Sequence, residues 1–129
     1  MGEGVVRIML VEDQVGFRRA IAFLLSREPD LEVVAQAGSL DEARRCAAMV
    51  DFDVAILDLG LPDGNGADLI GALRETNPGV VVLVMSATLD GASLARAQEV
   101  GANGVLDKLA TPEEAVGTIR HLSSGSAGT

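Results

Sequence analysis

The stretch that decides the fold reads Val54-Ala55-Ile56-Leu57-Asp58-Leu59-Gly60-Leu61-Pro62-Asp63-Gly64-Asn65-Gly66. A short apolar run of this kind favours a strand that is buried on both faces of a parallel sheet. The strand must end before Pro62 and the glycines, because proline cannot donate to a sheet and glycine favours turns. Asp58 would then lie where ligands bind in open α/β sheets. Aspartate is also a common turn former at strand ends, and this stretch alone leaves both interpretations open.

Composition restricts the class of protein. The chain has 129 residues, one cysteine and a net charge of −9. This length predicts one domain that buries roughly two thirds of the surface of its unfolded chain. Cys46 cannot form an internal disulfide, and no signal peptide or membrane-spanning apolar stretch is found. We therefore expect a soluble, cytoplasmic protein without membrane contact. The acidic balance argues against direct binding of nucleic acid, whose phosphates attract clustered Lys and Arg.

Apolar runs alternate with segments of helical spacing along the whole chain. We expect strands at residues 5–11, 31–37, 51–58, 80–85 and 104–107. We expect helices between residues 13 and 29, from 39 to 49, between 66 and 77, at 90–100 and from 111 to 122. This alternation predicts an α/β fold, a doubly wound five-stranded parallel sheet of strand order 2-1-3-4-5 with five helices. One domain would span residues 1–122, and residues 123–129 would be a flexible tail or the start of a linker.

Polar side chains follow four of the five predicted strands. They are Glu12 and Asp13 after the first, Asp58 after the third, Ser86 after the fourth and Lys108 after the fifth. Because the carboxyl ends of parallel strands share one edge, and the predicted order makes these strands neighbours, the side chains should converge. Lys108 is the only lysine among ten basic residues, which favours a role for a compact ammonium at that place.

Three converging carboxylates predict a bound cation. Two carboxylates about 5 Å apart repel by roughly 3 kcal/mol at an effective dielectric near 20. Oxygen ligands favour Mg²⁺ over a transition metal. The only histidine, His121, lies in the last predicted helix and is expected to be a solvated residue there.

A carboxylate beside a cation, a lysine and a hydroxyl can accept a phosphoryl group, because the two positive groups neutralise the phosphoryl oxygens. Asp58 would be the nucleophile. Taken singly, each residue also has a purely structural explanation. Glu12 or Asp13 could serve merely to cap the following helix, and Ser86 could merely end a strand. Their joint placement at one edge favours the phosphoacceptor site.

Four motifs in order resemble the receiver domain of two-component response regulators. They are Val11-Glu12-Asp13-Gln14, residues 57–66, Met85-Ser86-Ala87 and residues 101–108. The resemblance covers about residues 5–122 and implies the flavodoxin/CheY-like fold. Residues 108–114 resemble the NarL/FixJ subgroup, whose receivers usually precede a DNA-binding domain. Val105 departs from the family, which usually has Tyr or Phe at that position.

The resemblance implies a phosphorylation-dependent signalling switch. A sensor histidine kinase would phosphorylate Asp58, Lys108 would contact the phosphoryl group, and Ser86 would hydrogen-bond it. Mg²⁺ would be held by Glu12, Asp13, Asp58 and the backbone carbonyl of Gly60. The surface of the fourth helix, fifth strand and fifth helix would then change, with possible homodimer formation. The output would be transcriptional, and any contact with DNA would be made by a further, C-terminal domain.

Three alternatives compete with this interpretation. An aspartate-nucleophile phosphatase would carry Asp-x-Asp, but Gly60 stands at the second position, so we expect no enzymatic turnover. A flavodoxin-like electron carrier would need a Ser/Thr-rich phosphate loop and stacking aromatics, and neither is present. A degenerate receiver that only docks partners is disfavoured because all the phosphorylation residues are intact, although Val105 leaves the output step open.

Overall fold

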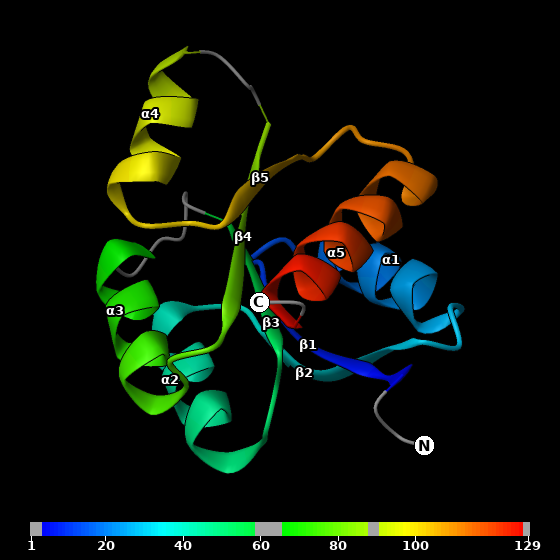
Figure 1. The fold of residues 1–129 in the computed structure, drawn as a ribbon, viewed down its shortest axis with the longest axis horizontal. Helices are drawn as coiled ribbons and strands as arrows, with labels where there is room; N and C mark the ends of the chain where they lie inside the picture. Colours follow the sequence, from blue (N-terminus) through cyan, green and yellow to red (C-terminus); the bar gives the residue numbers. More distant parts are fainter. Residues whose placement is uncertain (1–3, 59–65, 88–90, 128–129) are drawn as a thin grey trace.

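The computed structural model describes residues 4–58, 66–87 and 91–127, in which five strands alternate with five helices (Figure 1). The strands are β1 (Val6–Val11), β2 (Leu31–Ala37), β3 (Val54–Asp58), β4 (Val81–Ser86) and β5 (Gly104–Asp107). The helices are α1 (Val15–Ser26), α2 (Leu40–Met49), α3 (Gly66–Thr76), α4 (Gly91–Glu99) and α5 (Pro112–Ala127). All strands are parallel and lie in the order β2-β1-β3-β4-β5, which confirms the predicted fold.

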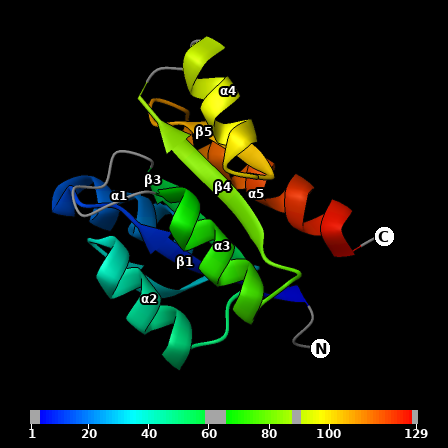
Figure 2. The ribbon, with the colours of Figure 1, turned by 90° about the vertical axis from the view of Figure 1, so that its left-hand side faces the viewer.

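The helices form two layers around the sheet. α1 and α5 cover one face, and α2, α3 and α4 cover the other (Figures 1 and 2). Successive residues of a strand point to opposite faces, so a central strand supplies both cores. In β3, Val54 and Ile56 pack under α1 and α5, while Ala55 and Leu57 pack on the other side. This double burial explains why the sequence of β3 is a continuous apolar run.

Two helices begin with a capping residue at the predicted start, residue 39 or 111. Ser39 Oγ accepts a hydrogen bond of 3.1 Å from the Glu42 N–H at the start of α2. At the start of α5, Thr111 Oγ1 accepts from the Glu114 N–H at 3.1 Å, and Glu114 Oε1 accepts from the Thr111 N–H at 2.8 Å. These bonds satisfy N–H groups that the first helical turn leaves without partners.

β1 begins and β4 begins and ends one residue later than predicted, and two larger differences lie near the sheet. β3 begins at Val54 rather than at residue 51, because the side chain of Asp53 accepts the Arg7 backbone N–H at 2.8 Å in place of a strand carbonyl. Asp13 does not cap α1. The N-cap is Gln14, which makes no side-chain capping bond, and Glu12 Oε2 accepts the Gln14 N–H at 3.0 Å instead.

The last helix is longer than predicted. α5 continues to Ala127, so the first five residues of the predicted flexible tail, 123–127, are helical. No proline stops the helix there, and the half-buried side chain of Leu122 still packs on the core beneath it. The division of the chain at residue 122 stays a prediction. Across the described residues, none of the helices has the length and apolar character needed to traverse a membrane.

α4 is held mainly at its C-terminal end. Among its described side chains, only that of Ala97 is buried. Gly101 follows α4 with φ of 83°, a conformation that favours glycine and ends the helix. Arg74 of α3 donates to the Gly101 carbonyl at 2.5 Å and to Asn103 Oδ1 at 2.8 Å. Asn103 Oδ1 also accepts from the Val82 N–H at 2.8 Å, so one network joins α3, β4 and the end of α4.

Candidate functional site

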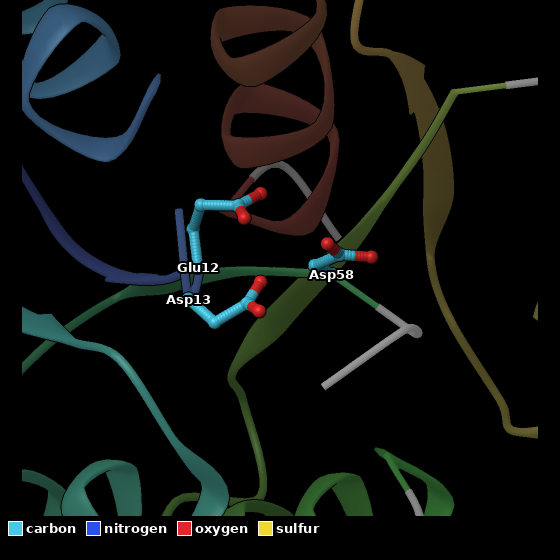
Figure 3. A group of neighbouring side chains, drawn as sticks. All are labelled: Glu12, Asp13 and Asp58. Atoms are coloured by element: carbon cyan, nitrogen blue, oxygen red, sulfur yellow. The ribbon is translucent and has the colours of Figure 1, made fainter. Parts of the chain in front are cut away.

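The carboxylate cluster forms where β1 and β3 end side by side. The sheet register pairs Val11 with Leu57, so Glu12 and Asp58 occupy the next position on adjacent strands. One carboxylate oxygen from each of Glu12, Asp13 and Asp58 lies within 4.8 Å of the others. Figure 3 shows the three side chains directed toward a common space. The predicted convergence of these carboxylates is therefore confirmed.

The three acids differ in burial. The side chain of Glu12 is fully buried, that of Asp58 is 13% exposed, and Asp13 lies at the surface. Burial is the main influence on Glu12 and raises its pKa, and the charge of Asp58 acts in the same direction. Hydrogen bonds from the Gln14 N–H and from Lys108 act against this rise and do not cancel it. The negative charge of Glu12 is thus costly without a cation beside it.

Lys108 supplies a positive charge to this cluster. Its Nζ lies 2.7 Å from Asp58 Oδ2 and 2.9 Å from Glu12 Oε1, and its side chain is 16% exposed. Burial alone would lower the pKa of Lys108, but the hydrogen bonds with Asp58 and Glu12 outweigh it, so the pKa is raised. The amine therefore stays protonated and links the nucleophile candidate to the buried acid.

β4 and β5 place Ser86 and Lys108 at the same edge. Ser86 ends β4 and pairs with Asp107, the last residue of β5. The Lys108 N–H donates to the Ser86 carbonyl oxygen at 2.9 Å, which joins the two strand ends directly beside the carboxylates. Ser86 is half-buried and Ala87 is exposed. The predicted carbonyl ligand, Gly60, lies outside the described residues.

Two further predicted positions lie away from the cluster. Val105 pairs with Val84 and packs, half-buried, against the core under α2, α3 and α4. This placement gives Val105 a packing role. His121 is exposed on α5 and is not one of the grouped carboxylate or lysine residues. Its expected place as a solvated helix residue is confirmed.

Two residues of α1 contact the site and were not predicted to do so. The ring centroid of Phe17 lies 5.2 Å from Lys108 Nζ, a cation–π contact. Arg18 Nη1 donates to the backbone carbonyl of Glu12 at 2.8 Å. The helical spacing identifies Phe17 only as a core-facing residue. Nothing in the sequence connects either side chain with Lys108 or Glu12.

A model of the response regulator receiver domain family matches residues 8–120. The chain belongs to this family. The receiver domain is 32% identical over 120 residues to the DNA-binding transcriptional activator DevR/DosR of Mycobacterium tuberculosis, covering 93% of this chain and 55% of that protein. It is 37% identical over 119 residues to protein-glutamate methylesterase/protein-glutamine glutaminase 1 of Caulobacter vibrioides, covering 92% of this chain and 34% of that protein. The chain thus spans about half or less of either relative.

A solved structure supports the same subgroup. The signal receiver domain of the response regulator NarL from Mycobacterium tuberculosis superposes with a TM-score of 0.85 at 30% identity, covering 94% of this chain and 98% of that one. Together with the DevR/DosR relative, this likeness confirms the NarL/FixJ-like subgroup.

Proposed function

We propose that this receiver domain is a signalling switch in which Asp58 accepts a phosphoryl group from a sensor histidine kinase, a class of enzyme that phosphorylates receivers. One observation carries the proposal. The Asp58 carboxylate stands at a strand end, 2.7 Å from the Lys108 ammonium, among two further carboxylates. The grouping supplies both a nucleophile and the charges that a phosphoryl transfer needs.

In the proposed step, an oxygen of Asp58 forms a bond to the phosphorus of the phosphohistidine. The P–N bond breaks, and its electron pair returns to the imidazole, which takes up a proton. Lys108 contacts the transferred phosphoryl oxygens, and Ser86 donates a hydrogen bond to one of them. The receiver accepts one group and does not turn over a substrate, so we assign no enzymatic activity. A cytoplasmic location agrees with the unpaired Cys46.

The described donor set fits Mg²⁺, because it consists of three carboxylates and contains no histidine or thiolate. Glu12, Asp13 and Asp58 would hold the ion, with the carbonyl of Gly60 as a further ligand. When bound, Mg²⁺ neutralises negative charge on the acids and on the phosphoryl oxygens. The direct test is intact-mass measurement: we expect a gain of one phosphoryl group with a small phosphodonor and Mg²⁺, and no gain when Mg²⁺ is chelated.

Asp13→Ala is expected to weaken Mg²⁺ binding on the order of tenfold or more, because it removes one of the grouped carboxylates. Amide NMR during a Mg²⁺ titration gives the affinity. Asp51→Ala is the matched control, since it removes the same charge from an exposed residue that precedes β3 at the opposite edge of the sheet. Equal affinity in Asp13→Ala and the wild type would place the metal elsewhere.

We also propose that phosphorylation alters the surface of α4, β5 and α5 and promotes a homodimer that serves a transcriptional output. The names of DevR/DosR and of other regulators among its relatives support that output. DNA would be contacted by another domain, since the charge of this chain opposes phosphate binding. The degenerate docking module is the weaker alternative, because the acids and Lys108 are brought together.

Ser86→Ala is expected to abolish any phosphorylation-dependent self-association, whereas Val105→Ala should keep it and lower stability by roughly 1 kcal/mol. The reason is that Ser86 ends β4 beside Lys108, while Val105 packs in the core. We expect the change to pass from Ser86 through the backbone that follows it. Thr88, a further residue of that segment, lies outside the described residues. Sedimentation with and without beryllofluoride, a mimic of the phosphoryl group, measures self-association and so tells which of the two residues couples it to phosphorylation. A response lost in Val105→Ala and kept in Ser86→Ala would reverse the assignment.

A further inference from the structure

The backbone of Glu12 is held from two sides. Its N–H donates to the carbonyl of Ala37, the last residue of β2, at 2.9 Å. Its carbonyl accepts from Arg18 Nη1 at 2.8 Å. Arg18 therefore fixes the peptide that joins Glu12 to Asp13, the two acids that follow β1.

The guanidinium of Arg18 occupies a space that a glycine leaves open. A Cβ at Gly38 would lie 3.0 Å from Arg18 Nη1 and 3.9 Å from the carbonyl oxygen of Glu12. Gly38 directly follows β2, so the guanidinium lies between the ends of β1 and β2. A contact of 3.0 Å is tighter than most contacts of a Cβ atom, so alanine at this place would push the Arg18 guanidinium by a few tenths of an ångström.

Arg18 makes no ion pair in the described part of the chain, and its buried Nε has no hydrogen-bond partner there. A buried donor without a hydrogen-bond partner lowers the stability of the fold. The hydrogen bond to the Glu12 carbonyl is thus the polar contact that defines the position of its head group. No hydrogen bond to the carboxylate of Asp13 occurs among the described residues, so within this part of the chain its backbone is what places that exposed side chain.

We propose that Arg18 is a positioning residue for the magnesium site: by holding the Glu12 carbonyl, it sets the peptide that directs Asp13 toward Asp58. This inference rests on the proposed function, because it assumes that Asp13 binds Mg²⁺. It assigns Arg18 no contact with the metal or with the phosphoryl group. Arg18 acts through the backbone alone.

The direction in which Mg²⁺ affinity changes when Arg18 is removed separates this role from a simple charge effect. Arg18 is positive and lies close to acids that would bind a cation. If only its charge mattered, removing it would strengthen Mg²⁺ binding, because like charges repel. If it positions Asp13, removing it weakens binding despite the lost repulsion.

The experiment compares three variants with the wild type by Mg²⁺ titration, followed through the amide signals of Asp13 and Gln14. Arg18→Met should weaken binding about tenfold, the size expected for residues that orient ligands. Gly38→Ala should weaken binding by less, because it only pushes the guanidinium aside. Gly38→Ala does so without a change in charge. Because both changes act on one contact, the double variant should lose no more than Arg18→Met alone. Arg19→Met is the control, since it removes the same charge from the exposed neighbouring residue.

A second readout needs no metal. In the metal-free protein, Arg18→Met and Gly38→Ala should shift the Asp13 amide signal and speed its hydrogen exchange, while Arg19→Met should not. Unchanged or tighter Mg²⁺ binding in Arg18→Met, or wild-type affinity in Gly38→Ala, would overturn the inference. If the wild type bound no Mg²⁺, or if Asp13→Ala did not change Mg²⁺ affinity, the proposed metal site would be wrong, and the role of Arg18 would be wrong with it.

Discussion

Asp58→Asn is expected to abolish the gain of one phosphoryl group that the wild-type protein shows with a small phosphodonor and Mg²⁺. The amide oxygen of asparagine is a far weaker nucleophile than a carboxylate oxygen. The substitution keeps the shape of a side chain that is only 13% exposed, so the strand end should remain in place. Intact-mass measurement under identical donor and metal concentrations gives the labelled fraction directly.

The matched control is Asp53→Asn, which makes the same chemical change just before the other end of β3. Asp53 accepts hydrogen bonds from Arg7 and lies away from Lys108, so this variant should still be labelled. Labelling of Asp58→Asn to the wild-type extent would show that another residue is the acceptor.

Lys108→Arg is expected to abolish the phosphorylation-dependent change as fully as Lys108→Ala, although it keeps the positive charge. The ammonium lies 2.7 Å and 2.9 Å from two carboxylates and has Phe17 beside it, in a space that leaves 16% of the side chain exposed. A guanidinium is planar and larger and prefers a fork-like arrangement of acceptors. It cannot take the place of the ammonium next to the phosphoryl oxygens without displacing one of these neighbours.

Sedimentation of samples whose phosphorylation has been verified by mass measures this effect. Lys108→Ala defines the complete loss of response. Arg44→Lys, an exchange between the same two residue types at an exposed position of α2, away from the α4, β5 and α5 surface, is the control. Wild-type self-association in phosphorylated Lys108→Arg would show that charge alone is sufficient at this position.

The arrangement of the main site groups could be predicted from the sequence because parallel strands bring their carboxyl ends to one edge. Glu12 and Asp58 each follow an apolar run directly, and Lys108 follows the last residue of β5, Asp107. Their meeting follows from the strand order. A local signal gave the start of α5, where Thr111 and Glu114 exchange capping bonds, but the local signal at Asp13 did not give a cap of α1.

Contacts that depend on helix packing could not be predicted. Phe17 reaches Lys108 only because α1 and α5 pack on the same face of the sheet, and helical spacing gives no information about the far partner. The start of β3 was predicted three residues early because no local pattern shows that the Asp53 side chain bonds Arg7. The end of α5 was missed because the packing of Leu122 extends the helix past its glycine and serine residues.

The network around Arg74 fixes α4 at one end only. Its C-terminal end is anchored through Gly101 and Asn103 to α3 and β4, while Ala97 is the one buried side chain described along its length. A helix of this kind pivots more readily than it slides, because translation would break every bond of the anchor at once. A displacement that begins beyond Ser86 would therefore be largest at the N-terminal end of α4 and vanish at Gly101, so a partner that reads the switch would contact the first turn.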